Sequence, residues 1–379
     1  MSARTSSGPG ILTRILGSQW FVSVLAVLIA FVIGAVLIAL SGASVLDAYY
    51  AMFRGSIIDP NAATFVRQIK PLTDSLFYSI PLIISGLGLA LGFRAGLFNI
   101  GGKGQIIVGA LAAVWVGFAV NLPPVVHTLV ALLVAIVAGG LYAGIAGVLK
   151  AKTGANEVIV TIMLNSIATL GLGYTLTQKA WQVPGSNQPV TPKVADSAAL
   201  TRLLPAPFKL HVGFIVALVA LAFFWWLIER STLGFQIRAV GANAAAARTA
   251  GISVERITAI TMVLSGAFLG LAGANEALGT IGYVSRDVAG SIGFDAITVA
   301  LLGRNKTWGT FGAGLLFGAF KAGGYTMQAK GVPIDMILIL QSVIVLLIAA
   351  PALVRWLFRL PDVRALAAQT RKGNADEHK

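Results

Sequence analysis

Long apolar runs alternate with short polar segments along almost the whole chain, and this pattern predicts membrane-spanning helices. Runs of about 20 residues, enough to cross a hydrocarbon core of about 30 Å, recur along the sequence. We expect ten spans, near residues 20–41, 74–93, 105–121, 124–148, 157–177, 210–229, 255–277, 293–303, 307–328 and 333–355. Since no soluble domain of useful size remains between them, the chain is predicted to be an all-α polytopic membrane protein.

Composition supports the membrane class. Of 379 residues, 57% are hydrophobic and only 11% are charged, and the mean hydropathy is +0.85. A soluble domain averages about 25% charged residues. Cysteine is absent, which excludes a disulfide framework, a thiolate metal site and a cysteine nucleophile.

The formal charge of +14 is distributed as expected for a membrane protein rather than a nucleic-acid-binding one. Ten spans put both termini on one side, and with the termini in the cytoplasm the inner segments hold 18 of the 28 Lys and Arg residues. This bias follows the positive-inside rule. The first apolar run follows Arg4 and Arg14 as in a signal peptide, but it exceeds a signal core of about 7–15 residues, so we interpret it as a retained anchor.

The second half of the membrane region repeats features of the first in the opposite orientation. Small-xxx-small glycine pairs, which let helix backbones approach closely, occur at Gly140 and Gly144 and again at Gly314 and Gly318. Each pair follows a glycine-interrupted apolar segment, and paired interruptions indicate a transport pathway. Glycine is common in membrane helices, so chance pairs remain the alternative. The expected order is a cytoplasmic tail (1–19), anchor helix (20–41), first repeat (74–177), extracytoplasmic loop (178–209), cytoplasmic loop (230–254), second inverted repeat (255–355) and basic cytoplasmic tail (356–379).

Several polar side chains fall within or beside apolar runs, where a charge costs on the order of 3 kcal/mol. Glu157 and Glu276 suit structural contacts to neighbours, and Asp295 suits an ion pair with Arg286 or Arg304. The alternative is that they contact a solute. Neutral amides and an aromatic ring near the first interruption suit an uncharged, hydrogen-bonding solute. The candidate substrate pathway comprises Phe98, Asn99, Gln105, Asn165 and Asp295.

The chain carries no motif for its own energy source or for catalysis. Gly96 to Lys103 approaches a phosphate-binding loop, but the glycine frame is wrong and Gly104 follows where Ser or Thr would bind Mg²⁺. The three histidines lack metal-ligand spacing. We therefore expect no metal, no cofactor and no enzymatic activity.

A basic, alanine-rich loop between the sixth and seventh spans is the most informative polar segment. A helix-forming stretch of this length on the cytoplasmic side suits a docking surface for another protein.

Four segments together resemble permeases in the nucleoside branch of bacterial ABC importers. Phe93 to Gly101 with Gly104 and Gln105 resembles the FRAGLFNIGAEGQ signature, and Asn156 to Asn165 resembles NEVISTIMLN. The loop from Arg238 to Ile252 is similar to the coupling loop of that branch, and Gly293 to Arg304 resembles GFDxIAVALLGR. The resemblance implies a coupling helix over about 239–250 that docks on an ATPase. The implied coupling residues are Arg238, Gly241, Asn243, Ala246, Ala247, Arg248, Gly251 and Ile252. The chain departs from the pattern at Gly102 and Lys103, where the family usually has Ala and Glu, so any solute role of that position is in doubt.

The resemblance implies a type II ABC importer-like half-transporter in a bacterial inner membrane. Such permeases assemble with a second, often non-identical permease, a cytoplasmic ABC ATPase and an extracytoplasmic solute-binding protein. The implied cargo is a nucleoside. A simple-sugar permease of the related branch is the alternative, and an ion-coupled secondary transporter using Glu157, Glu276 and Asp295 is a more distant one.

Overall fold

The computed structural model describes residues 19–329 except 187, together with 331–333 and isolated positions between 336 and 358. The predicted last span, 333–355, and both tails lie wholly or mostly outside the described residues. Between them the chain forms α2 (Gln19–Leu40), α3 (Val45–Ser56), α4 (Phe65–Arg94), α5 (Gly102–Ala119), α6 (Val126–Thr153), α7 (Glu157–Thr175), η1 (Lys179–Trp181), α8 (Gly213–Arg230), α9 (Thr232–Ala242), α10 (Ala244–Thr249), α11 (Val254–Asn275), η2 (Glu276–Ile281), α12 (Ile292–Leu302) and α13 (Thr307–Gln328).

The chain is a multi-pass membrane protein built from helices. Six stretches of the described residues are long and apolar enough to cross a membrane, namely α4, α5, α6, α7, α8 and α11 continued by η2. Shorter apolar helices cover Val24–Leu40 and Ile292–Leu302. No β-strand occurs in the part of the chain that the structure describes, where the one strand-like pairing is an isolated bridge between Arg202 and His211. The number of ten spans and the inverted repeat stay predictions.

The chain divides into two compact units. One comprises residues 1–49 and 327–379, the other residues 50–326. Within the first unit, the Tyr49 hydroxyl donates a hydrogen bond to the Phe31 carbonyl of α2, and the two rings pack edge to face at 5.4 Å. Ala26 of the same helix packs in an apolar cluster with Leu347.

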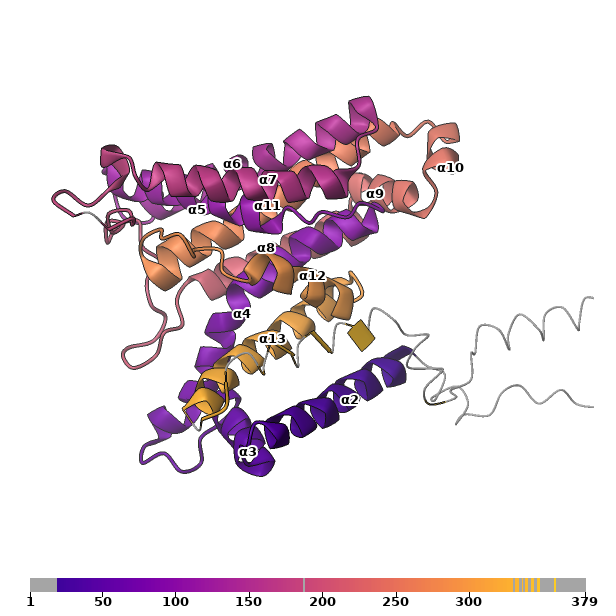
Figure 1. Cartoon of the computed structure of the whole chain (residues 1–379). Coiled ribbons are helices and arrows are strands. Elements are labelled where there is room, and N and C mark those ends of the chain that lie inside the picture. The colour runs from indigo at the N-terminus through magenta and orange to yellow at the C-terminus, as the bar shows by residue number, and fades with distance from the viewer. Residues whose placement is uncertain are drawn as a thin grey trace, which may run out of the picture. The chain divides into compact units, whose positions relative to one another are not determined.

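In the second unit α11 is the central helix. It packs most extensively on α6 and also contacts α5 and α4, while α4 contacts α12 and α8 (Figure 1). Figure 1 also shows α9 and α10 at one end of this unit and the loop after α7 at the other. The buried side chains of α11 include Met262, Phe268 and Leu269, so apolar packing surrounds it on several sides.

Glycines of α11 allow its backbone to lie directly against the backbones of α5 and α6. A Cβ on Gly266 would lie 2.3 Å from the Gly139 carbonyl oxygen of α6, and one on Gly270 would lie 2.2 Å from the Ala135 carbonyl oxygen. A Cβ on Gly273 would lie 2.2 Å from the Ile106 carbonyl oxygen of α5. Backbones in direct contact gain van der Waals attraction, which drives helix association where lipid removes the hydrophobic driving force.

The four glycines predicted to pack helices all lie against neighbouring elements. Gly140 and Gly144 face Val263 of α11, and a Cβ on them would lie 3.1 Å and 2.9 Å from its atoms. A Cβ on Gly314 of α13 would lie 2.5 Å from Ile83 of α4, and one on Gly318 would lie 2.6 Å from the Ser75 carbonyl oxygen. The first pair therefore serves α6–α11 packing and the second serves α13–α4 packing.

Both predicted interruptions separate helices. The first falls between α4 and α5, where Gly96 adopts a left-handed φ of +73° and Leu97 N–H donates back to the Gly92 carbonyl at 2.9 Å. The second falls between η2 and α12, where Gly282 has a φ of +80° and caps η2 through a bond to the Ala277 carbonyl.

Gly139→Leu is expected to lower the amount of folded protein strongly. A Cβ there would lie 2.5 Å from the Gly266 carbonyl oxygen, which belongs to backbone and cannot rotate away, and overpacking costs about 1–3 kcal/mol or more. Size-exclusion chromatography of the detergent-solubilised, tagged protein measures the effect. Gly171→Leu on α7 is the control, since nothing lies within 4 Å of a Cβ there. Equal yields of both variants would contradict the packing role.

Candidate functional site

The segment predicted to dock another protein forms two short helices rather than one. The expected helix over 239–250 is divided at Asn243, whose extended backbone (φ −161°, ψ 104°) ends α9 and begins α10. The Asn243 side-chain oxygen accepts the Ala246 N–H at 3.0 Å. Asparagine is among the best helix N-cap residues, so the residue type itself signals this division.

The second helix is closed by a glycine turn that leads into α11. Gly251 has a φ of +81°, and Ile252 N–H donates to the Ala247 carbonyl at 3.0 Å. Ala247 is buried, whereas Arg248 is exposed and pairs with Glu255 in the first turn of α11 at 2.5 Å. An exposed ion pair contributes little stability, so the glycine turn and the Ala247 contact position α10.

Arg238 anchors α9 to the preceding membrane helix. Its guanidinium donates to the Ile228 carbonyl and lies 3.6 Å from a carboxylate oxygen of Glu229. The other Glu229 oxygen lies 3.8 Å from Arg94, and the Arg94 Nε donates to the Asn305 carbonyl at 2.8 Å. The Glu229 carboxylate of α8 thus interacts with an arginine of α4 and an arginine of α9.

Gly241 brings α9 against the first interruption. A Cβ on Gly241 would lie 2.0 Å from the Arg94 carbonyl oxygen, and a Cβ on Gly96 would lie 3.6 Å from Gly241. The backbone of α9 therefore lies directly against the backbone between α4 and α5.

An apolar groove runs between α9 and α10. Its volume is about 570 Å³, and Phe235 on its wall is 60% exposed. The other lining residues are Thr232, Gln236, Ala239, Ala242, Asn243, Ala246, Ala247, Ala250 and Ile252. The many alanines leave a shallow surface against which another protein can pack closely.

Two of the amides predicted to line the solute pathway form hydrogen bonds with each other. Asn99 Nδ2 donates to Gln105 Oε1, and Gln105 Nε2 donates back to Asn99 Oδ1, both at 3.0 Å. Asn99 also donates to Ser265 of α11 at 3.0 Å and accepts from Gly101 N–H at 2.9 Å. Both amides are 1% exposed, so a solute that bonded them would first have to open this network.

Asn165 and Glu157 fix the same interruption from α7. Asn165 accepts the Gly104 N–H and donates to the Ile100 carbonyl, each at 2.8 Å. Glu157 pairs with Lys150 at 2.6 Å and accepts the Phe98 N–H at 3.4 Å. Phe98 itself is 39% exposed and packs on Phe93 at 4.8 Å.

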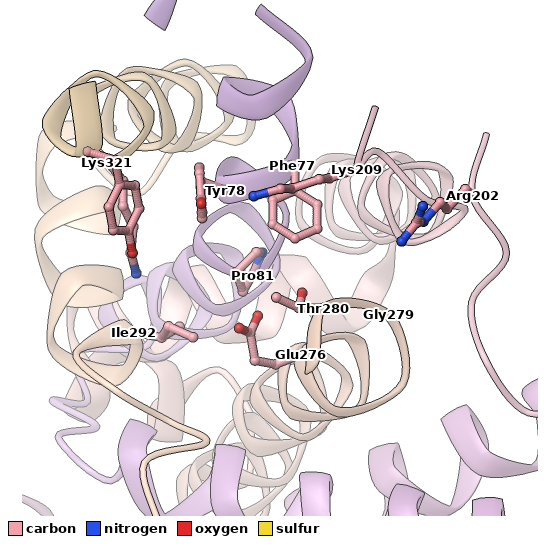
Figure 2. Close-up of a pocket in the computed structure, with 11 residues that line it drawn as sticks. Phe77, Tyr78, Pro81, Arg202, Lys209, Glu276, Gly279, Thr280, Ile292 and Lys321 are labelled. Carbon is pink, nitrogen blue, oxygen red and sulfur yellow. The ribbon is translucent and has the colours of Figure 1, made fainter. Parts of the chain in front are cut away.

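A polar cavity of about 440 Å³ lies between α4, η2 and α13 (Figure 2). Glu276 and Thr280 contribute to it from η2, Phe77, Tyr78 and Pro81 from α4, and Lys321 and Tyr325 from α13. The remaining lining residues are Arg202, Lys209, Gly279 and Ile292. Asp295, the last predicted pathway residue, accepts the Ser291 hydroxyl at 2.6 Å and is attracted by the same Lys321.

Sequence analysis missed Tyr78, Thr280, Lys321 and Tyr325 as candidates for this cavity. Lys321 carried a usable signal, because a lysine inside the apolar run 307–328 is expensive unless it faces a partner or water. The two tyrosines carried none, because a tyrosine in a membrane helix equally suits the lipid interface.

Gly241→Val is expected to abolish solute-stimulated ATP hydrolysis while leaving the protein in the membrane. The added Cβ meets the Arg94 backbone at 2.0 Å, which pushes α9 away from the first interruption. Solute-stimulated ATPase activity of the purified, reconstituted complex measures the loss. Gly171→Val introduces the same side chain where nothing lies within 4 Å and serves as the control. Unchanged stimulation in Gly241→Val would refute a coupling role for this contact.

Several known proteins are similar to this chain over most of its length. The guanosine ABC transporter permease protein NupP of Bacillus subtilis is 39% identical over 349 residues, covering 89% of this chain and 95% of NupP. The glucose ABC transporter permease protein TsgB13 of Haloferax volcanii is 35% identical over 333 residues, covering 85% of each chain. The nucleoside ABC transporter permease protein NupB of Lactococcus lactis is 30% identical over 357 residues, covering 92% of this chain and 94% of NupB. No solved structure gives a significant match.

A family model described as the permease component of the branched-chain amino acid transport system matches residues 72–349. This range includes all four segments on which the sequence resemblance rested. The predicted family is confirmed: the chain belongs to this family of transport-system permease components.

Proposed function

We propose that this permease is the membrane-spanning subunit of an ATP-driven importer that moves nucleosides into the cell. The observation that carries the proposal is the similarity to the guanosine permease NupP over nearly the full length of both chains. The nucleoside permease NupB is also similar over most of this chain. A relationship that spans the whole membrane domain includes both the regions that couple and the regions that contact solute.

The energy for transport would come from a cytoplasmic ABC ATPase. The groove between α9 and α10 offers that partner an apolar surface with exposed Phe235 at its wall. Movement of α9 would reach the first interruption through the Gly241–Arg94 contact, and movement of α10 would reach α11 through the Gly251 turn. ATP performs work here only by binding more tightly to one arrangement of the ATPase subunits than to the other.

The complete transporter would contain further subunits. The proposed assembly has a second permease, a non-identical homologue of this chain, and a solute-binding protein outside the membrane. We place α9, α10 and both termini in the cytoplasm of a bacterial cell and the loop 178–209 outside, as the distribution of Lys and Arg favours.

The sugar alternative rests on the 35% identity to the glucose permease TsgB13. The higher identity and coverage of NupP favour a nucleoside. An ion-coupled mechanism has less support, because Glu157 is tied to Lys150 at 2.6 Å and to Phe98 N–H rather than exposed to an ion pathway.

Reconstitution with the ATPase, second permease and binding protein tests the cargo. Guanosine, adenosine or uridine is expected to stimulate ATP hydrolysis and to accumulate in proteoliposomes, whereas ribose, galactose and glucose are not. An ATPase subunit unable to hydrolyse ATP should stop accumulation. A response to sugars alone would establish the sugar permease, and uptake driven by an ion gradient without the ATPase would refute the proposal.

The absence of cysteine from the chain permits a direct test of topology. Arg248→Cys in α10 is expected to react with a membrane-impermeant maleimide in inside-out vesicles and not in intact cells. Gln188→Cys in the loop after α7 is the matched control and should show the opposite pattern, since both native side chains are exposed. Labelling of Arg248→Cys from outside intact cells would exclude contact with a cytoplasmic ATPase.

A further inference from the structure

The polar cavity beside η2 is shaped by an irregular helix and a proline. η2 is a π-helix that continues α11 from Glu276 to Ile281, and short π segments frequently occur at functional sites. Pro81 in α4 has no N–H to donate to the carbonyl of Phe77, one turn earlier. Irregular backbone therefore borders the cavity from two sides.

Glu276 has capacity to accept hydrogen bonds from a solute. Its carboxylate is hydrogen-bonded by Thr280 and attracted by Lys321 of α13. A carboxylate offers about four acceptor positions, so one hydroxyl leaves most of them available. Figure 2 shows Glu276 and Thr280 directing their polar groups into the space between η2 and the α4 residues Phe77 and Tyr78.

Aromatic rings line the cavity beside this carboxylate. The Tyr78 and Tyr325 rings lie 5.4 Å apart with an angle of 36° between their planes. Phe77 is held by an edge-to-face contact with His211 at 5.4 Å. Tyr325 is 45% exposed, so its ring has free surface. Flat rings stack at such centroid distances, which favours a solute with an aromatic ring of its own.

Buried amide and imidazole groups adjoin the same helix. Within the described residues, neither Asn275 side-chain atom nor His211 Nε2 has a hydrogen-bond partner, although both residues are at most 1% exposed. A Cβ on Gly279, which lines the cavity, would lie 2.4 Å from the His211 ring. Buried polar groups are normally hydrogen-bonded. Water or a polar group of a solute is therefore expected to bond to Asn275 and His211 on this side of the cavity.

A second cavity adjoins this site and is lined in part by Pro207 and Lys209 of the segment before α8. Its volume is about 1050 Å³. It shares Tyr78, Lys209 and Tyr325 with the polar cavity beside η2, which we call the inner cavity. Its charged residues include the Arg54–Asp59 ion pair at 2.6 Å and the Lys70–Asp74 pair. A solute in this second cavity would meet the two tyrosines before it reached Glu276.

Beyond Pro81 along α4 the helices are closely packed. A Cβ on Gly86 of α4 would lie 2.7 Å from Val299 of α12, and one on Gly88 would lie 2.8 Å from the Ser265 carbonyl oxygen of α11. α4 is thus in direct contact with α11 and α12 beyond Pro81, whereas the second cavity adjoins the inner cavity at Tyr78 and Tyr325.

We propose that the inner cavity is a solute-binding site within a single chain, in which Glu276 accepts two neighbouring hydrogen-bond donors and Tyr78 and Tyr325 stack on a flat ring. This inference rests on the proposed nucleoside function. A nucleoside supplies the donor pair in two ways, through the ribose 2′- and 3′-hydroxyls or through the N1–H and amino group of guanine.

Transport by the complete reconstituted complex tests Glu276. Glu276→Gln, which replaces one acceptor oxygen by a donor, is expected to raise the KM for guanosine by about tenfold or more, as for loss of a hydrogen bond to a charged group. Asp287→Asn is the matched control, since Asp287 is exposed. Tyr325→Ala tests stacking through the same KM measurement, with Tyr174→Ala at another exposed tyrosine as its control.

Solute analogues distinguish the two donor pairs. If Glu276 binds the ribose, the wild type should transport 2′,3′-dideoxyguanosine poorly and Glu276→Gln should add no further loss. If it binds the guanine edge, the wild type should instead transport inosine poorly, because inosine lacks the amino group. Glu276→Gln should then add no further loss with inosine. An unchanged KM for all three solutes in Glu276→Gln would overturn the site.

A labelling experiment decides the case in which Glu276→Gln fails to assemble. Thr280→Cys is expected to react with a methanethiosulfonate reagent in the reconstituted complex, and guanosine should slow that reaction at least about fivefold, whereas ribose should not. Equal rates with and without guanosine would refute the site. If the wild-type complex imports no nucleoside at all, the proposed function fails; if it does and these variants match their controls, only the site fails.

Discussion

Close contact between helix backbones around α11 is the constraint on which the membrane domain depends. Gly266 and Gly270 let α11 touch α6, and Gly273 lets it touch α5, at distances that no side chain would permit. Lipid tails are as apolar as leucine, so tight packing has to supply the association that the hydrophobic effect supplies in water. A helix held in this way on several sides moves as a rigid body or not at all.

This rigidity joins the two ends of the domain. α11 begins at Val254, directly after the glycine turn that ends α10, and its last residue, Asn275, precedes the π-helical turn that presents Glu276. α11 therefore links α10 at one end to the cavity wall at the other. The second connection runs through Gly241 and Glu229 to the end of α4, which also lines the cavity through Tyr78.

The charged and amide groups around the first interruption are paired with one another or with neighbouring residues. Glu157 is neutralised by Lys150, and Asn99 and Gln105 satisfy each other. These groups hold the first interruption in a fixed shape, because a polar group without a partner costs free energy in a medium of low dielectric constant. Glu276 differs, since it faces a cavity that still has room for a solute beside Thr280 and Lys321.

The long apolar helices, the two interruptions and the family could be predicted from the residues alone. Apolar runs and glycines are local signals, and α4 to α8 and α11 lie where those runs predicted them, whereas α3 and the division between α9 and α10 were not predicted. Which polar residues meet depends on the packing of distant elements. Tyr78 and Lys321 lie 243 residues apart in the sequence, with Glu276 between them, and their meeting depends on how α4, η2 and α13 pack. The same packing pairs Asn99 with Gln105 and Ser265, because side-chain direction at an interruption is set by neighbours and not by the chain alone.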